Sequence, residues 1–191
     1  FEECDIFFDA SMKISVSAEN IFNAKNLKLV VTATTGASHM DQRALEQRGV
    51  PLLTLKGQKE ILQELTPAAE QSWLLLMACA RHFRGAIHHV EDSQWNRVEF
   101  PGLMLKGKTI GIIGLGRIGS WMACYATAFG MKVQAYDPFN HEINNDVEMV
   151  DLNCLLSTSD FITIHVHLTS ETAKIIDAER IKLFKRGSIF I

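Results

Sequence analysis

The sequence predicts an α/β protein in which parallel strands alternate with helices. Short, β-branched apolar runs, typical of strands covered on both faces, recur along the chain, and stretches with helical spacing separate them. One such run, residues 109–113, leads into a glycine-rich turn, a helical pattern and a second strand pattern. This order is typical of a doubly wound parallel sheet with helices on both faces.

The segment after that run is Gly-Leu-Gly-Arg-Ile-Gly, residues 114–119, which matches the pattern G-x-G-x-x-G. In this pattern Gly114 permits a sharp turn, Gly116 removes a side chain where a pyrophosphate approaches the backbone, and Gly119 lets the helix pack closely on the sheet. The helix directs its free N–H groups and its positive end toward the phosphates. The turn therefore predicts a dinucleotide site in a Rossmann-type sheet.

The residues after the turn support this interpretation. Apolar residues recur at helical spacing up to Gly130, which is placed to end the helix, and residues 131–136 alternate as a second strand. Asp137 ends that strand roughly 20 residues past the turn, where a dinucleotide fold has the carboxylate that binds both ribose hydroxyls. A carboxylate would repel a 2′-phosphate, and residues 137–139 contain no arginine, so we predict NAD rather than NADP. The alternative is an ordinary βαβ unit with an incidental glycine turn.

The residues before residue 66 predict a second, smaller α/β domain of flavodoxin-like type. Thr66 and Pro67 mark the boundary, because a capping residue followed by proline is typical of a helix start. We therefore expect one domain over residues 1–65 and a nucleotide-binding domain over residues 66–191. In the smaller domain, strands are expected at residues 4–8, 28–32 and 50–55, and helices at residues 18–24 and 41–48.

The nucleotide-binding domain is expected to begin with a helix from Thr66 to about Phe83. This segment is apolar nearly all round, which indicates burial against a sheet or in a subunit contact. Residues 95–108 are interrupted by proline and glycine and indicate an excursion that leads back to the central strand. Towards the C-terminus the pattern predicts strands at residues 147–149 and 161–165 and at Ser188, and helices at residues 152–156 and 178–184.

Two loops at the carboxyl ends of expected strands are candidate ligand-binding segments. Residues 32–41 are polar and contain a glycine, so their backbone amides are suited to a carboxylate or a phosphate. A loop that merely caps the next helix through Asp41 explains the same residues equally well. The second loop, His165-Val166-His167, shares a sheet edge with the glycine turn if the strands are parallel, so it should border the cofactor. Packing and backbone contacts are favoured over metal or proton chemistry for its histidines.

Composition argues against several function classes. The 191 residues carry a net charge of -3 without a block of like charges, which gives no basic surface for nucleic acid. No apolar run is long enough to span a membrane, and no signal peptide is evident. The four cysteines are scattered without a C-x-x-C pair, which is typical of reduced core thiols in a cytoplasmic protein.

One cluster of metal-ligating residue types, His88, His89, Glu91 and Asp92, suggests a possible metal site. Adjacent side chains diverge, and no further ligand follows at zinc spacing. A solvated loop is the favoured interpretation, and no metal is expected.

Several segments stand in a characteristic order: TTGASHMD, TPAAEQSW with a later arginine, LKGKTIGIIGLGRIG, YDP, SDFITIHVHLTSET and LFKRGSIFI. In this order they resemble the D-isomer-specific 2-hydroxyacid dehydrogenases, the family of phosphoglycerate, glyoxylate/hydroxypyruvate and formate dehydrogenases. The resemblance covers nearly the whole chain. It implies an NAD-dependent oxidoreductase that transfers a hydride between nicotinamide and a small D-2-hydroxyacid or 2-keto acid. It also implies a homodimer formed through the nucleotide-binding domain.

The resemblance assigns roles to individual residues. Arg117 and Ile118 would present backbone groups to the pyrophosphate, and Asp137 would bind the adenosine ribose. Thr35 and Gly36 match the loop whose amides hold the substrate carboxylate, so the smaller domain would be the substrate side. The other implied cofactor contacts are Ser72, Gly114, Gly116, Gly119, His165, Val166 and Thr172.

The chain departs from the family pattern at two places. The usual H-x-P is His165-Val166-His167 here, so the proline is absent. The catalytic arginine of an N-x-x-R-G motif, the glutamate and the histidine have no match in the chain and are expected beyond Ile191. Both domains are therefore expected to be incomplete, in an interior piece of a longer protein. Two alternatives stay open: a non-catalytic NAD sensor that resembles corepressors of this family, and a related dehydrogenase acting on amino acids or adenosylhomocysteine.

Overall fold

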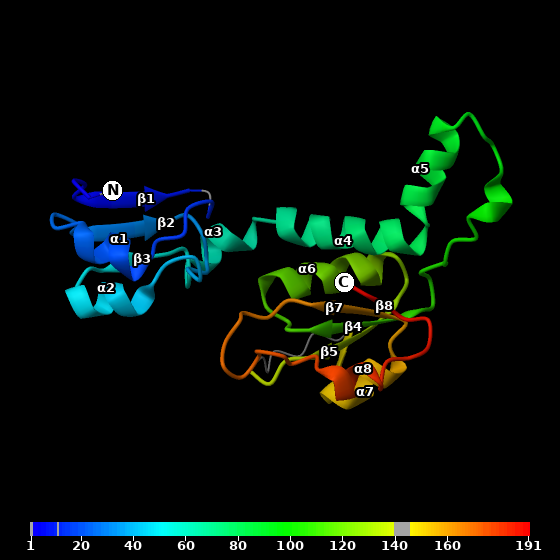
Figure 1. Cartoon of the computed structure of the whole chain (residues 1–191). Coiled ribbons are helices and arrows are strands. Elements are labelled where there is room, and N and C mark those ends of the chain that lie inside the picture. The colour runs from blue at the N-terminus through cyan, green and yellow to red at the C-terminus, as the bar shows by residue number, and fades with distance from the viewer. Residues whose placement is uncertain (1, 11, 140–145) are drawn as a thin grey trace. The chain divides into compact units, whose positions relative to one another are not determined.

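The computed structural model describes residues 2–10, 12–139 and 146–191, and the chain divides into two compact units, Phe1–Glu64 and Leu65–Ile191. Each unit contains one parallel sheet, with the strand order β1-β2-β3 in the first and β6-β5-β4-β7-β8 in the second (Figure 1). The expected α/β class is confirmed.

The first unit is a three-stranded sheet with short helices. A capping box between Ser17 and Asn20 starts α1, and the carboxylate of Asp41 accepts a hydrogen bond from the Ala44 N–H to start α2. Gly49, at φ 65°, ends α2 in the left-handed conformation that glycine adopts without strain. The elements are β1 (Ile6–Asp9), α1 (Ala18–Asn23), β2 (Leu29–Thr32), α2 (Gln42–Arg48), β3 (Leu52–Leu53) and α3 (Lys59–Gln63).

The second unit is a five-stranded sheet with helices on both faces. Its strand β4 lies at the centre, where it pairs with β5 on one side and β7 on the other. The elements are α4 (Pro67–Ala80), α5 (Phe83–Glu91), the 3₁₀ helix η1 (Arg97–Glu99), β4 (Thr109–Ile113), α6 (Arg117–Ala128), β5 (Lys132–Tyr136), β6 (Val147–Met149), α7 (Leu152–Thr158), β7 (Phe161–Ile164), α8 (Ala178–Ile181) and β8 (Ile189–Phe190).

The order of the second sheet creates a topological switch point. From β4 the chain continues through α6 to β5 and β6 on one side, and then crosses to β7 and β8 on the other. Figure 1 shows α4 and α6 on one face of this sheet and α7 and α8 on the opposite face. In such a sheet, the crevice outside the carboxyl ends of the strands at the switch point is where ligands bind. Here that point lies between the ends of β4 and β7.

Two apolar cores hold the second unit together. On one face, Leu76 of α4 and Met122 of α6 pack with Ile110 and Ile112 of β4. On the other face, Ile113 packs with the α7 leucines, which are fully or almost fully buried. A sheet covered on both faces explains why β4 consists of continuous apolar residues rather than alternating ones.

Helix α4 starts where expected, with Thr66 as its N-cap residue and Pro67 in its first turn, but the side chain of Thr66 does not cap it. Thr66 has helical backbone angles, and its hydroxyl donates to the carboxylate of Glu70, 2.6 Å away, instead of capping the helix. Within this chain the helix buries Leu76 and Ala80, whereas Leu74 and Leu75 are exposed, which leaves the subunit contact as the remaining option for that side. The Arg117 guanidinium donates to the carbonyl oxygen of Leu65, just before α4.

The prediction of a solvated loop around His88 and His89 is wrong, because these residues belong to helix α5. His82, at φ 49°, separates α5 from α4. The ring of Phe100 packs 3.0 Å from the position of a Cβ at Gly85, which shows why a residue without a side chain stands inside this helix. Its apolar residues recur at helical spacing, a pattern that the paired histidines obscured.

The cysteines also differ from the expectation of core thiols. Cys79 and Cys124 are exposed, and Cys4 and Cys154 are half-buried. Within the described ranges, helices that are both long and apolar enough to cross a bilayer are absent.

Candidate functional site

The glycine turn between β4 and α6 occupies the carboxyl edge of the second sheet, and each of its glycines has a distinct physical reason. Gly114 adopts φ +90°, and a Cβ there would lie 2.7 Å from the carbonyl oxygen of His165. A Cβ at Gly119 would lie 2.1 Å from the carbonyl oxygen of Gly114. At Gly116 a Cβ would meet no heavy atom of the described residues within 4 Å. Two glycines are thus required by protein packing, whereas the third borders open space.

The open position at Gly116 lies at the start of α6. Gly116 is the N-cap of this 12-residue helix, and within the described residues no side chain caps it. The Ser120 N–H closes the first turn onto the Gly116 carbonyl oxygen at 2.8 Å. The backbone N–H groups of Arg117 and Ile118 belong to the first turn, where helices present donors and positive potential to anions. A glycine cradle and a helix N-terminus therefore fit a dinucleotide pyrophosphate at one place.

Asp137 follows directly after β5 and is hydrogen-bonded to the glycine turn. Its Oδ2 accepts from the Leu115 N–H at 2.9 Å, and its Oδ1 accepts from the Phe139 N–H at 2.9 Å. The Gly114 N–H donates to the carbonyl oxygen of Tyr136 at 2.9 Å, which joins the end of β5 to the same turn. The half-buried carboxylate is thus fixed beside the turn by two backbone donors, where a ribose attached to the pyrophosphate would reach it.

The end of β7 forms the other side of the turn. The His165 N–H donates to the Ile113 carbonyl oxygen at 2.8 Å, and Cγ1 of Val166 lies 2.8 Å from the position of a Cβ at Gly114. Nε2 of His165 lies 2.8 Å from the hydroxyl of buried Thr163. Burial lowers the pKa of His165 from 6.5 to about 4, so its imidazole is neutral at pH 7.

The loop after β7 is held in shape by threonine side chains. The Thr172 hydroxyl donates to the carbonyl oxygen of His167 and accepts from the Thr169 N–H at 2.8 Å. This turn follows Val166 directly, so Thr172 belongs to a loop that starts at the switch point. Ser72 lies on α4, half-buried, and donates to the Ala68 carbonyl oxygen at 2.9 Å. The cofactor contacts of Thr172 and Ser72 stay predictions.

In the first unit, Thr35 and Gly36 lie in the loop between β2 and α2. Thr34 donates to the carbonyl oxygen of Gly36 at 2.6 Å, and its hydroxyl lies 2.8 Å from that of buried Thr32. A Cβ at Gly36 would meet no heavy atom of the described chain within 4 Å. The loop therefore presents open backbone at its tip, although Asp41 caps α2 at the same time. Anion binding at the loop tip and capping of α2 by Asp41 are therefore compatible interpretations of this loop.

Sequence reasoning missed one contact in the same loop. Nε2 of His39 lies 2.8 Å from Oδ2 of Asp9; Asp9 is buried, and the His39 side chain is 9% exposed. Asp9 is the last residue of β1, and 30 positions separate it from His39. A local pattern does not signal such a pair. The only available hints were an acidic residue just past an apolar strand and a histidine in a candidate loop.

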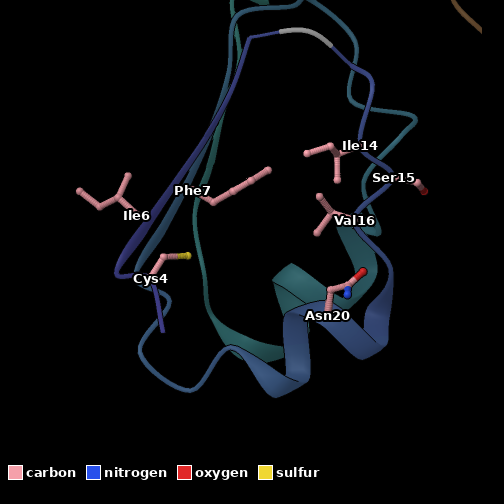
Figure 2. A pocket seen from close by; sticks show the side chains of 7 residues that line it. All are labelled: Cys4, Ile6, Phe7, Ile14, Ser15, Val16 and Asn20. Atoms are coloured by element: carbon pink, nitrogen blue, oxygen red, sulfur yellow. The ribbon is translucent and has the colours of Figure 1, made fainter. Parts of the chain in front are cut away.

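A pocket of about 380 Å³ also lies in the first unit. Figure 2 shows Phe7 pointing across it toward Ile14 and Val16, between β1 and the segment that leads into α1. The side-chain amide of Asn20, at its rim, is engaged by Ser17 in the capping box. The pocket is mostly apolar and is lined by residues other than those predicted for binding, so it adds no chemistry to the candidate site.

The metal-ligating residue types near residue 90 are engaged with neighbours. Nδ1 of His88 lies 3.1 Å from a carboxylate oxygen of exposed Glu91, and Nε2 of His89 accepts from the Asn96 N–H at 2.9 Å. Over the described ranges, no group of three or more potential ligands gathers to hold a metal ion.

Comparison with known proteins places these features in context. Residues 73–191 match the model of the D-isomer specific 2-hydroxyacid dehydrogenase NAD binding domain. The chain is 39% identical over 176 residues to a hydroxypyruvate reductase of Thermotoga maritima, a match that covers 92% of the chain and 56% of that relative. It is 38% identical over 179 residues to a D-3-phosphoglycerate dehydrogenase of Archaeoglobus fulgidus, covering 92% of the chain and 33% of the relative.

Solved structures show the same similarity. An NAD-dependent formate dehydrogenase from Staphylococcus aureus in complex with NAD matches with a TM-score of 0.85 and 29% identity, covering 99% of the chain and 56% of that structure. A D-lactate dehydrogenase from Aquifex aeolicus, complexed with NAD and lactic acid, matches with a TM-score of 0.84 and 27% identity over the same shares. The chain thus spans between a third and somewhat over half of the length of these relatives.

Proposed function

Because this chain belongs to the D-isomer specific 2-hydroxyacid dehydrogenase family, we propose that its protein transfers a hydride between NAD and C2 of a small 2-hydroxyacid or 2-keto acid. The observation that carries the proposal is the open glycine turn at the switch point, with the carboxylate of Asp137 hydrogen-bonded to it at Leu115. The bound cofactor supplies the hydride chemistry, and the protein supplies binding, orientation and electrostatics.

The second unit would hold the dinucleotide. The first-turn N–H groups of α6 at Arg117 and Ile118 are suited to the pyrophosphate, because Gly116 leaves the approach open. Asp137 would accept hydrogen bonds from the ribose hydroxyls, and its negative charge disfavours a 2′-phosphate. Neutral His165 and the adjoining Val166 would border the nicotinamide half without adding positive charge.

The first unit would hold the carboxylate of the substrate. The backbone N–H groups of Thr35 and Gly36 lie at an open loop tip beyond a parallel strand, a position suited to an anion. The reaction also needs a cation for the developing alkoxide and an acid or base for the proton. Among the described residues we assign neither role.

The direct test is an assay of the intact protein with NADH and NADPH against glyoxylate, pyruvate and hydroxypyruvate. We expect NADH to be oxidised with at least one of these acids and NADPH to be used less efficiently. NADH binding without turnover of any 2-keto acid would support a non-catalytic NAD sensor instead. An intact, folded protein that binds neither nucleotide would contradict the proposal.

We further propose that the protein is a homodimer formed through the second unit. Every described residue of α5 is at least partly exposed, and the segment that follows exposes Trp95 at 90% together with Val98. Figure 1 shows α5 and this segment extending away from the sheet of their own unit. Exposed apolar side chains of this extent are typical of a protein contact surface. A second copy would bury them together with Leu74 and Leu75 of α4.

Sedimentation velocity of the intact protein tests this assembly. We expect a dimer, and we expect the Trp95→Asp variant to dissociate at concentrations where the wild type does not. A monomeric wild type would contradict the proposal, as would an equally stable dimer of the variant. The matched control is Lys182→Ala, which removes an exposed charge at the C-cap of helix α8. We also propose a cytoplasmic location, which is supported by four scattered cysteines without a C-x-x-C pair.

A further inference from the structure

The carboxyl end of β1 carries a buried acid–imidazole pair that the proposed reaction does not use. Nε2 of His39 and Oδ2 of Asp9 are 2.8 Å apart, and their side chains are 9% and 3% exposed. Hydrogen bonds to charged groups are stronger than neutral ones, particularly where water is excluded. The contact therefore fixes the loop that carries His39 to the end of the neighbouring strand.

The pair joins the loops that follow β1 and β2. Both carboxylate oxygens of Asp9 lie within 3.2 Å of the Met12 N–H, in the loop after β1. The carbonyl oxygen of His39 accepts from the Val16 N–H at 2.9 Å, and the Val16 carbonyl oxygen accepts from the Asp41 N–H at 2.9 Å. Side chain and backbone thus tie the two loops together at several consecutive points.

His39 closes one end of the loop tip that contains Thr35 and Gly36. At the other end, the Thr34 hydroxyl donates to the Gly36 carbonyl oxygen at 2.6 Å. The Met40 N–H donates to the carbonyl oxygen of buried Ala37 at 3.1 Å, which forms a turn around His39. The open backbone at residues 35–36 therefore lies between two anchored points, and its orientation depends on both anchors.

A second acid–base pair on the same two strands is exposed, in contrast to the first. Asp5 and Lys28 lie at the opposite ends of these strands, 2.7 Å apart, with side chains 59% and 76% exposed. An exposed pair of this kind contributes little to stability. The two pairs have similar lengths, but only the pair at the carboxyl edge is shielded from water.

The imidazole of His39 has one further unusual feature. Its Nδ1 is buried and, among the described residues, has no hydrogen-bond partner. Leaving a buried polar atom unsatisfied is costly, so such atoms are rare in proteins and call for an explanation. Because one ring nitrogen has no hydrogen-bond partner, a contribution to stability does not by itself account for a histidine at this position. The need for its other nitrogen to hold the loop through Asp9 does account for it.

We propose that His39 is a positioning residue for the substrate carboxylate. Acting through Asp9, it holds the loop after β2 so that the backbone N–H groups of Thr35 and Gly36 are pre-organised for an anion. The inference rests on the proposed function and extends it to residues that the family pattern did not assign. Pre-organised donors bind an anion without an ordering cost at the moment of binding.

The test compares steady-state kinetics with glyoxylate in the intact protein. Glyoxylate has no side chain, so its KM reports mainly on the carboxylate and carbonyl contacts. We expect His39→Leu to raise KM about tenfold, the effect of losing one buried hydrogen bond to a charged group, with kcat and the Kd of NADH within about twofold. His39→Gln, whose amide can donate to Asp9, should recover most of the loss.

Two further variants complete the design. Lys28→Leu, the matched change at the exposed pair, should leave KM unchanged. The double variant Asp9→Asn with His39→Leu should be no worse than His39→Leu alone, because paired residues act as a unit. An unchanged KM in His39→Leu would overturn the inference, as would equal damage to KM, kcat and the Kd of NADH without rescue by glutamine. These results leave the proposed function intact, whereas a wild type that reduces no 2-keto acid overturns both.

Discussion

The two candidate ligand turns of this chain are built in different ways. The turn at residues 114–119 takes its shape from its own glycines, through a positive φ at Gly114 and a Gly114 carbonyl oxygen only 2.1 Å from the position of a Cβ at Gly119. The loop at residues 32–41 takes its shape from hydrogen bonds of distant and neighbouring side chains, above all the contact of His39 with Asp9. One turn is determined by backbone conformation, the other by tertiary contacts.

This difference decides how each turn responds to change. A shape that depends on the absence of side chains fails sterically when a methyl group is added. A shape that depends on hydrogen bonds tolerates added volume at its open tip but loosens when an anchor is removed. Both turns leave one glycine facing open space, Gly116 and Gly36, so a methyl group added at either position tests ligand binding with little effect on folding.

The largest effect is expected at Gly119. In Gly119→Ala the new methyl group would overlap the Gly114 carbonyl oxygen, so α6 would have to move off the sheet. We expect the free energy of unfolding to fall by about 3 kcal/mol or more, measured by urea denaturation. Ser120→Ala, at the next and exposed position, is the control and should change stability by less than about 0.5 kcal/mol. Equal stability of both variants would contradict the packing role of this glycine.

At Gly116 we expect binding to suffer rather than folding. In Gly116→Ala the methyl group enters open space where the pyrophosphate would lie. The unfolding free energy should fall by less than about 1 kcal/mol, the cost of alanine at an N-cap. The Kd of NADH, followed by tryptophan fluorescence, should rise at least about tenfold, which corresponds to about 1.4 kcal/mol. An unchanged Kd would show that the phosphates do not approach this residue.

The histidine beside the glycine turn provides a pH test. Burial lowers the pKa of His165 from 6.5 to about 4, so between these values the unfolded chain binds a proton that the folded chain does not. The contribution of neutral His165 to the free energy of unfolding is therefore fully present above pH 6.5, and it is lost as the pH falls toward 4.

Relative to His165→Asn, the wild type should lose on the order of 1–2 kcal/mol of unfolding free energy between pH 7 and pH 4, after allowance for the partial exposure of the ring. Denaturant unfolding of both proteins across this range measures the difference. Parallel curves for the two proteins would mean that the imidazole titrates normally.

The smallest effect on stability is expected at Gly36. Its backbone does not require glycine, and a methyl group there would meet no described atom within 4 Å. We expect Gly36→Ala to change the unfolding free energy by less than about 0.5 kcal/mol and to raise the KM for glyoxylate. A large loss of stability with normal KM would place Gly36 among packing residues and remove it from the substrate loop.

Local patterns were enough to predict much of the second unit. The strands at residues 109–113 and 147–149 are confirmed at both ends, and α6 with Gly130 just beyond its C-cap was also expected. These elements carry their information within a few residues, as an apolar run, a glycine or a helical repeat. The position of Asp137 beside the turn follows from the parallel pairing of β4 with β5.

The remaining features depend on contacts that a local pattern does not contain. Helix α5 was missed because its paired histidines suggested a solvated loop, and its glycine is explained only by Phe100, which lies outside the helix. The strand expected at residues 50–55 is reduced to Leu52–Leu53. The pairing of Asp9 with His39 requires two loops to meet, so it becomes visible only in three dimensions.

The central claim is that the turn and the carboxylate bonded to it hold NAD. Isothermal titration of the wild type and Asp137→Ala with NAD and with NADP measures this most directly. In the variant we expect NAD binding to weaken by roughly 1–3 kcal/mol, for lost hydrogen bonds to a charged group, and the preference over NADP to narrow. Unchanged NAD affinity in Asp137→Ala, with the wild-type preference retained, would contradict it.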